Sequence, residues 1–375
     1  MKIVIKWIGY TLVAGLLLLV AIFITVNSID EELNPAIPAL LQRLQQPVLE
    51  NGNAYYSLLG LWRDQPDLKQ LPVDQTENEN PRTISLQLNG IRLCHSKQSQ
   101  SCFSMLQKHN AAYQQVFNDN HLLLQRYRRV LDFTFYQEPF PESDYQTKEL
   151  MKLHQLYLTK QATDWQAGQK NNALTDLVRS HVFWRRVMDA DTSLVTRLIA
   201  ITVLEDNFRL LSDILDRCGD CRTHQSVLKT MLIPFTAKAL SQKQTMLREF
   251  ANLALLLPRA NSSHEQDAFF GRNLQGKLLA VLYRPNTLRN NMYKLFSLYA
   301  DLTDLPLSEY KTKRIELDQQ IEKLMNPSWH EQFFNFVENR LLAIAWPSTM
   351  YYERNQQLET TRRQLTNRLK EDKGI

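Results

Sequence analysis

The sequence predicts an all-α protein, in which one N-terminal transmembrane helix is followed by a multi-helix bundle or an irregular array of α-hairpins. Two observations lead to this prediction. Residues 7–26 carry no charge, and from about residue 99 onward apolar side chains recur with helical spacing. The chain has only 10 glycines in 375 residues, which argues against glycine-rich phosphate loops, nucleotide-binding folds and turn-rich β architectures.

The uncharged stretch from Trp7 to Val26 is twenty residues long. As a helix it would span about 30 Å, the thickness of the hydrocarbon core of a bilayer. Lys2 and Lys6 are the charges that precede it. Because basic residues remain on the cytoplasmic side, residues 1–6 are expected to be cytoplasmic. In a bacterium this describes a single-pass inner-membrane protein with a periplasmic C-terminal domain.

A cleaved signal peptide is the second interpretation of this segment. Val26 and Ser28 could form a permissive cleavage site. The apolar core of a signal peptide is about 7–15 residues long, however, and this one is longer, so we favour an uncleaved anchor. No later segment reaches about 18 consecutive uncharged apolar residues, so a single span is predicted.

Residues 27–98 are expected to form a juxtamembrane helix and an irregular segment. The helix falls near residues 36–46. Near residues 83–94, apolar residues alternate on both sides of Asn89-Gly90, which is a hairpin signal. Because an isolated hairpin is marginal unless it packs on other elements, this segment is predicted to be a small loop or a β-hairpin.

Residues 99–375 are predicted to form the helical periplasmic domain. Prolines mark several helix boundaries, where a missing N–H does least harm. Pro234 lies inside a predicted helix and should kink or split it, and Asp191 is placed to cap the helix that follows it. The predicted helices span residues 99–118, 120–134, 145–167, 170–188, 191–216, 224–240, 242–256, 265–282, 286–303, 307–325, 328–345 and 348–371.

The chain contains four cysteines, and an even number outside the cytoplasm predicts disulfides. Local spacing favours Cys94–Cys102 and Cys218–Cys221. For Cys94 and Cys102 we favour a structural disulfide over a free buried pair or a metal site. For Cys218-Gly-Asp-Cys221 a structural disulfide is again favoured, while a redox dithiol and a metal site remain alternatives.

No catalytic constellation, cofactor site or metal site is predicted. His330-Glu331 resembles the start of a zinc-protease motif, but Phe334 stands where the second histidine is required. No Gly-x-Ser-x-Gly motif is present. The net charge of +5 is spread along the chain, which argues against nucleic acid as a partner.

Two runs mix aromatic residues with arginine, a combination that can grip anionic ligands or lipid headgroups. The ordinary interpretation, which we favour, is that the aromatic rings pack inward and the arginines face water. The candidate interaction residues in these runs are Arg126, Arg128 and Arg129, and Trp184, Arg185 and Arg186.

The last predicted helix has a narrow apolar stripe made of Leu358, Leu365 and Leu369 on an otherwise very polar sequence. Such a stripe suits a two-helix seam, either within the chain or with a partner. A frayed terminal helix is the alternative. These three leucines are therefore further candidate interaction residues.

Five features follow one another along the chain: the run 53–60, the pair Cys94 and Cys102, and the runs 126–129, 183–186 and 194–204. Together they resemble a group of uncharacterised single-pass inner-membrane proteins of Gram-negative bacteria. The resemblance covers roughly half of the chain and implies a helical periplasmic domain. It implies no activity and no functional residues, and Cys218 and Cys221 are not part of it.

The sequence therefore favours a membrane-anchored interaction or accessory protein of the cell envelope, with a protein partner there, over an enzyme. One alternative is an envelope enzyme, either a hydrolase or a thiol-disulfide oxidoreductase that uses Cys218 and Cys221. Another alternative is the binding of a lipid or small molecule in a groove between helices.

Overall fold

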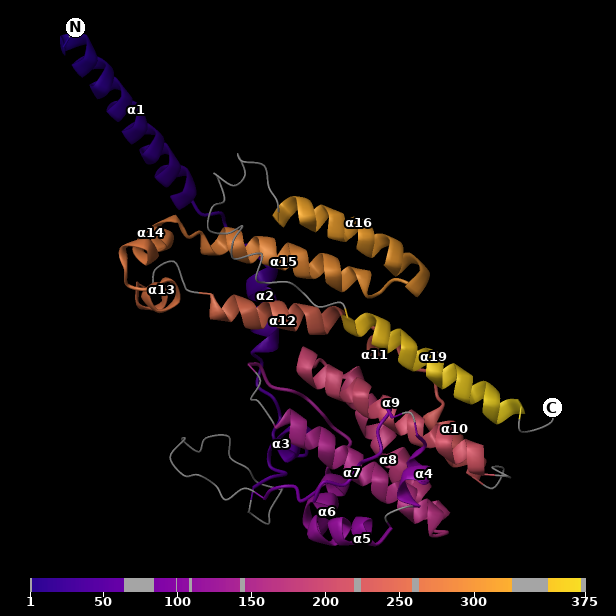
Figure 1. Cartoon of the computed structure of the whole chain (residues 1–375). Coiled ribbons are helices and arrows are strands. Elements are labelled where there is room, and N and C mark those ends of the chain that lie inside the picture. The colour runs from indigo at the N-terminus through magenta and orange to yellow at the C-terminus, as the bar shows by residue number, and fades with distance from the viewer. Residues whose placement is uncertain are drawn as a thin grey trace. The chain divides into compact units, whose positions relative to one another are not determined.

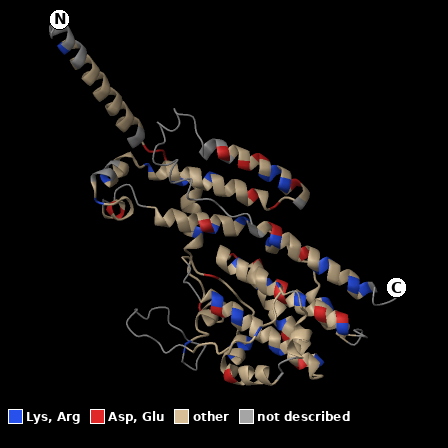
Figure 2. Ribbon diagram, viewed as in Figure 1, with Lys and Arg blue, Asp and Glu red and all other residues tan. Residues whose placement is uncertain are grey.

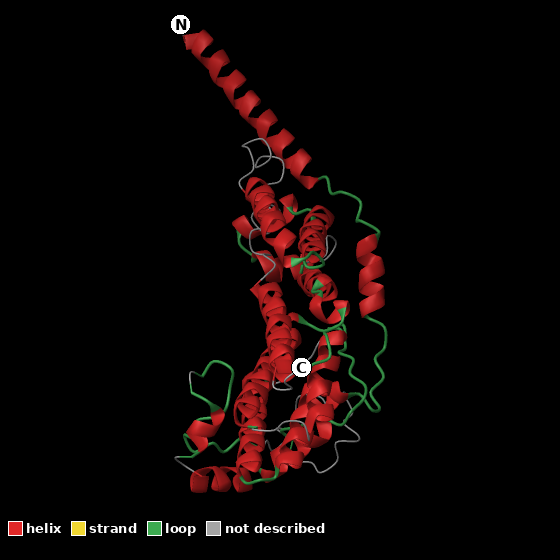
Figure 3. Cartoon of the chain, turned by 90° about the vertical axis from the view of Figure 1, so that its right-hand side faces the viewer, coloured by secondary structure: helices red, strands yellow, loops and turns green. Residues whose placement is uncertain are grey.

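The computed structural model describes residues 2–63, 84–98, 100–107, 110–141, 146–218, 224–257, 263–325 and 350–371. Every regular element in these ranges is a helix, as Figure 1 and Figure 3 show. An isolated β-bridge joins Asn53 and Phe135. The predicted all-α class is confirmed.

The chain divides into two compact units. Unit 1 combines residues 1–44 with residues 246–349, and unit 2 combines residues 45–245 with residues 350–375. Residues 45–98, which the sequence grouped with the juxtamembrane helix, therefore belong to unit 2.

Three long helices form the centre of unit 2: α7 (Thr147–Gln166), α8 (Lys170–Asp189) and α9 (Leu194–Arg217). Each of them packs against the other two. Their apolar faces bury aliphatic and aromatic side chains that belong to one continuous hydrophobic core. Gly168 follows α7 with a φ of +84°, the left-handed conformation in which glycine ends a helix at no steric cost.

The cap of α9 differs from the prediction. Ser193, not Asp191, is the N-cap residue, and its hydroxyl accepts a hydrogen bond from the N–H of Thr196 at 3.3 Å. Asp191 forms an ion pair with Lys238 at 3.2 Å. The capping position requires an extended backbone immediately before the helix, and the chain reaches that geometry two residues later than expected.

Further helices complete unit 2. Pro234 divides the predicted helix 224–240 into two, as expected, and the predicted helix 99–118 is also two helices. The further helices of unit 2 are α3 (Ala54–Leu59), α4 (Cys102–Leu106), α5 (Asn110–Asp119), α6 (His121–Val130), α10 (Gln225–Met231), α11 (Ala237–Leu240) and the last helix, α19 (Met350–Glu371).

Unit 1 contains α1 (Lys2–Ser28), α2 (Ala36–Leu44), α13 (Ser263–Phe270), α14 (Leu274–Leu282), α15 (Pro285–Leu302), α16 (Leu307–Met325) and most of α12 (Lys243–Leu256). Over the residues that the structure describes, no helix combines the length and the apolar character needed to cross a membrane. The predicted helix 328–345 lies outside the described residues.

The predicted helix 265–282 is broken at Gly271, which has a φ of +89°. Asn273 then caps α14 by accepting a hydrogen bond from the N–H of Gly276 at 2.7 Å. A Cβ atom at Gly276 would lie 2.1 Å from the carbonyl oxygen of Gly271. Glycine at this position therefore permits the close approach that the α13–α14 turn requires.

The acidic residues that follow α1 cap a helix far away in the sequence. The carboxylate of Asp30 accepts hydrogen bonds from the N–H groups of Asn286 (3.0 Å) and Thr287 (2.9 Å), in the first turn of α15. The side chain of Asn290 donates to Glu31 and to the carbonyl of Glu32. The chain that leaves α1 is thus fastened to the N-terminus of α15.

Candidate functional site

Residues 84–98 have no regular structure, and side chains of neighbouring helices satisfy their backbone groups. Asn120, which precedes α6, donates to the carbonyl of Gln87 at 2.7 Å and accepts from its N–H at 2.8 Å. Tyr113 donates its hydroxyl to the carbonyl of Arg92 at 2.8 Å. Helix side chains therefore supply the hydrogen bonds that a second strand would otherwise provide.

The predicted turn is present, but the described residues on either side of it form no strand. Asn89 and Gly90 have φ values of 49° and 73°, as both central residues of a type I′ turn require. Of the two alternatives left open by the sequence, the structure has the loop. The pairing of Gln87 with Asn120 replaces the ladder of a hairpin.

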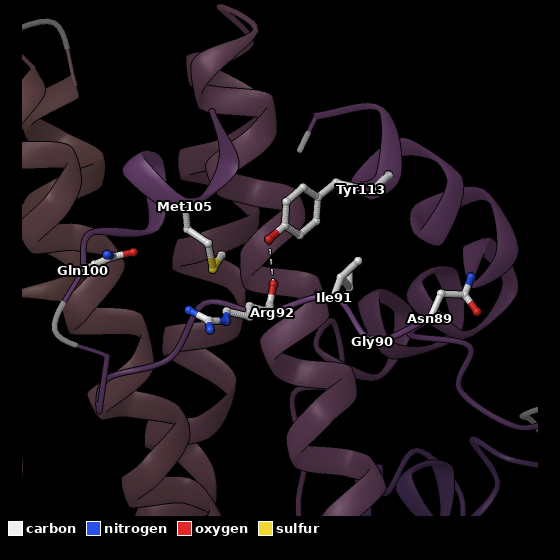
Figure 4. A pocket seen from close by; sticks show the side chains of 8 residues that line it. Asn89, Gly90, Ile91, Arg92, Gln100, Met105 and Tyr113 are labelled. Carbon is white, nitrogen blue, oxygen red and sulfur yellow. Dashed lines mark hydrogen bonds between the residues drawn. The ribbon is translucent and has the colours of Figure 1, made fainter. Parts of the chain in front are cut away.

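A cavity of about 490 Å³ lies beside this turn. Figure 4 shows Arg92, Met105 and Tyr113 around it, with the Tyr113 hydroxyl pointing to the Arg92 carbonyl. Burial, and next the neighbouring thiols Cys94 and Cys102, raise the pKa of Tyr113 to about 12. Tyr113 therefore remains a neutral hydrogen-bond donor at physiological pH.

Cys94 and Cys102 lie side by side in the core as free thiols, 1% and 2% exposed. The two side chains are hydrogen-bonded, and this contact together with burial raises the pKa of Cys102 far above its ordinary value. The predicted disulfide between them is thus not formed in this structure. The two side chains are nevertheless close neighbours in the core.

Two buried carboxylates of α9 hold this loop. Asp206 accepts a hydrogen bond from the N–H of Ser96 at 2.6 Å, and Asp213 accepts one from the N–H of Cys102 at 2.8 Å. The two aspartates are seven residues apart, so they lie on the same face of the helix. Burial raises the pKa of both carboxyl groups, and the backbone N–H groups compensate in part for the loss of water.

Sequence reasoning missed Asp206 and Asp213. The available signal was the heptad spacing of two acids on a helix that is otherwise rich in leucine and isoleucine. Acids at such positions are rarely buried without a partner. The partner here is a loop more than 100 residues earlier in the chain.

The second feature of the site is a groove of about 660 Å³, which we call the α9–α19 groove. Buried apolar side chains line part of it, and four of its five charged lining residues are basic. Its lining residues are Ser96, Lys97, Glu205, Phe208, Arg209, Ser212, Arg354, Gln357, Leu358, Thr361, Gln364, Leu365 and Arg368.

Helix α19 packs along α9 through the predicted leucine stripe. Leu358, Leu365 and Leu369 are all buried in the core of unit 2. The seam is therefore made within the chain. Basic and acidic residues both occur along α19 (Figure 2), and two of its arginines form ion pairs with acids on α9.

These two arginines flank the α9–α19 groove. Arg354 is paired with Glu205 through Nε at 3.1 Å and through its second terminal nitrogen. Arg368 is paired with Asp216 and donates to the hydroxyl of Ser212 at 2.8 Å. Both guanidinium groups thus fasten α19 to α9.

Trp184 belongs to a buried hydrogen-bond network. It is fully buried, and its indole N–H donates to the hydroxyl of Tyr127 at 2.9 Å. The same hydroxyl lies 3.1 Å from Nδ1 of His154. The prediction that Trp184 is an interaction residue is therefore wrong, because a partner at the surface cannot reach a fully buried side chain. The inward packing favoured from the sequence is what the structure shows.

Most of the candidate arginines have partners within unit 2. Arg126 is buried and donates to the carbonyls of Leu61 and Arg63, so it is also wrong as a surface contact. Arg128 forms an ion pair with Asp176 at 3.1 Å. Arg129 is exposed.

The two arginines of α8 hold loop backbone. Arg185 donates to the carbonyls of Ile233 and Pro234, and its guanidinium stacks over Phe235 at 4.6 Å. Arg186 donates to the carbonyl of Phe133 at 2.5 Å. The structure therefore does not bring the candidate arginines together into one binding surface.

Cys218 follows the last residue of α9, and Cys221 lies outside the described residues, so the Cys218–Cys221 disulfide stays a prediction. His330 and Glu331 also lie outside them. Among the residues that the structure describes, no three histidine, cysteine, aspartate or glutamate side chains are grouped so as to hold a metal ion. Comparison with protein-family models, curated proteins and solved structures finds no match to this chain.

Two buried histidines make the stability of unit 2 depend on pH. Burial lowers the pKa of His154 and of His181 to about 3. The folded chain keeps both rings neutral, whereas the unfolded chain takes up protons below about pH 6.5. Their contribution to the free energy of unfolding is complete above that pH and is lost as the pH falls toward 3.

We expect His181→Gln to flatten this loss of stability. Between about pH 6 and pH 4 the free energy of unfolding should fall less steeply in the variant, by up to about 1.4 kcal/mol per pH unit. Urea denaturation followed by circular dichroism measures it. His181 packs against Phe208, so the variant is also less stable at neutral pH and only the slope is diagnostic. Parallel curves for the two proteins would contradict this interpretation.

Proposed function

We propose that this chain is a single-pass membrane protein whose helical part outside the cytoplasm serves as an interaction or accessory module of the bacterial cell envelope. The observation that carries this proposal is the exposed, uncharged stretch of α1 and its attachment to the folded part of unit 1 through Asp30.

The surface of α1 supports a lipid environment. Its leucines from Leu16 to Leu19 are each 60–63% exposed, and a surface of this kind is costly in water. Thr11 and Thr25 donate their hydroxyls to the carbonyls four residues earlier, at 2.9 Å and 2.8 Å. Back-bonding of this kind satisfies hydroxyl groups where no water is present.

The attachment of the chain after α1 to α15 supports the proposal that the position of unit 1 relative to the membrane matters for function. Because Asp30 and Asn290 hold the chain directly after α1, unit 1 would be kept close to the bilayer rather than on a long flexible tether. A protein that works by contact with other envelope components benefits from such a fixed position. Lys2 and Lys6 favour the orientation with this part outside the cytoplasm.

A second candidate function is favoured by the α9–α19 groove. Its volume of about 660 Å³ falls within the range of small-molecule sites, about 300–1,000 Å³. Binding of a lipid or small molecule between helices would use this groove. The two functions are compatible, because an envelope accessory protein can respond to a ligand.

Two charges in the middle of α1 should prevent membrane attachment. We expect the full chain to stay in the membrane pellet after alkaline carbonate extraction, and the double variant Leu17→Arg, Leu18→Arg to leave it, because each arginine at mid-span costs about 2.5–3.5 kcal/mol. Ile29→Arg, placed just after the helix, is the matched control and should remain in the pellet. Extraction of the unaltered chain by carbonate would overturn the proposal.

Export predicts that the Cys94–Cys102 thiols are oxidised in the cell. Their side chains already touch, and closing this short loop is worth about 2–3 kcal/mol in the chain-entropy model. In a Cys218→Ser, Cys221→Ser background, acid quenching and denaturing alkylation should leave Cys94 and Cys102 unmodified unless a reductant is added first. Complete alkylation without reductant would mean that the pair remains reduced, as a cytoplasmic location requires.

A further inference from the structure

The basic residues of the α9–α19 groove fall into two classes. Arg354 and Arg368 are satisfied by carboxylates of α9 and hold the two helices together. Lys97 and Arg209 remain. Lys97 is exposed on the loop between the two cysteines, and within the described residues no carboxylate lies within ion-pair distance of it.

Arg209 is 32% exposed, and its ion pair within the chain is long. Its nearest carboxylate oxygen is that of Asp213 at 3.7 Å, and the other oxygen of Asp213 already accepts from Cys102. The Nε of Arg209 is buried without a hydrogen-bond partner. Among the described residues no acceptor lies within hydrogen-bond distance of its terminal nitrogens, so these can donate to an acceptor in the groove.

The groove offers several donors of different kinds. Arg209 supplies guanidinium N–H groups, Lys97 an ammonium group and Ser212 a hydroxyl. Phosphate oxygens accept hydrogen bonds from each of these kinds of donor, and the planar guanidinium of arginine suits phosphate in particular. Phe208 and Leu358 supply the adjoining apolar wall.

We propose that the α9–α19 groove binds a phosphate-bearing ligand, with Lys97 and Arg209 as the residues that contact the phosphate. The proposal deepens the second candidate function and rests on it, and it is independent of membrane attachment. The phosphate belongs either to a small soluble molecule or to a lipid headgroup, and the experiment separates these sources.

Isothermal titration calorimetry of the full chain in a neutral detergent, with inorganic phosphate as the probe, tests the site. We expect Lys97→Gln and Arg209→Gln each to weaken binding about tenfold or more. Arg129→Gln removes an exposed arginine elsewhere on unit 2 and should bind phosphate as the unaltered chain does. Lys97 is exposed on a loop, so Lys97→Gln remains informative even if Arg209→Gln destabilises the fold.

A second titration with monomeric short-chain phosphatidylglycerol, and with phosphatidylcholine for comparison, identifies the source. Tighter binding of phosphatidylglycerol than of inorganic phosphate, lost in Lys97→Gln, assigns the groove to a lipid headgroup. The reverse order assigns it to a soluble phosphate. The proposal is overturned if the unaltered chain binds no probe at about 10 mM, or if Lys97→Gln binds as tightly as the unaltered chain. Neither failure would alter the carbonate extraction of the protein.

Discussion

The carboxylate of Asp30 at the start of α15 is the contact on which the arrangement of unit 1 depends. Helix α15 begins with Pro285, and the preceding residue, Arg284, provides no side-chain cap. The N–H groups of the first turn therefore need an acceptor from elsewhere, and Asp30 supplies it across 256 residues of sequence. The same contact fixes the direction in which the chain leaves α1. Asp30 therefore both caps α15 and positions the proposed anchor relative to it.

Unit 2 solves a similar problem with the same chemistry. Its irregular segment passes over the helices without a strand partner, and its backbone groups are met by Asn120, Tyr113, Asp206 and Asp213. Burying two carboxylates is costly unless they are hydrogen-bonded. Backbone N–H groups of Ser96 and Cys102 provide those bonds. The aspartates in turn provide acceptors for these N–H groups, so each partner lowers the free-energy cost of burying the other. This mutual dependence places Lys97 at the edge of the α9–α19 groove.

Features with local signals were predictable from the sequence. Helical periodicity predicted the bounds of most helices to within a few residues. Pro234 divided its helix as expected, because proline removes a backbone hydrogen-bond donor at its own position. The long-range partners of polar side chains were not predictable. Nothing in the sequence indicated that Asp30 caps α15. Arg126 looked like a surface residue, although it donates to the carbonyls of Leu61 and Arg63. Lys97 and Arg209 line the same groove only because the loop folds onto α9, so nothing in the order of the sequence indicated the groove.

The most direct test of this account is amide hydrogen exchange at Asn286 and Thr287, measured in the full chain and in Asp30→Ala. Glu32→Ala is the control, since Glu32 contributes its carbonyl rather than its side chain to this contact. We expect slow exchange of both amides in the unaltered chain and in the control. In Asp30→Ala both amides should exchange about tenfold faster, as expected from a cap worth about 0.5–2 kcal/mol. Equal exchange in all three proteins would contradict the claim that Asp30 holds the chain after α1 onto α15.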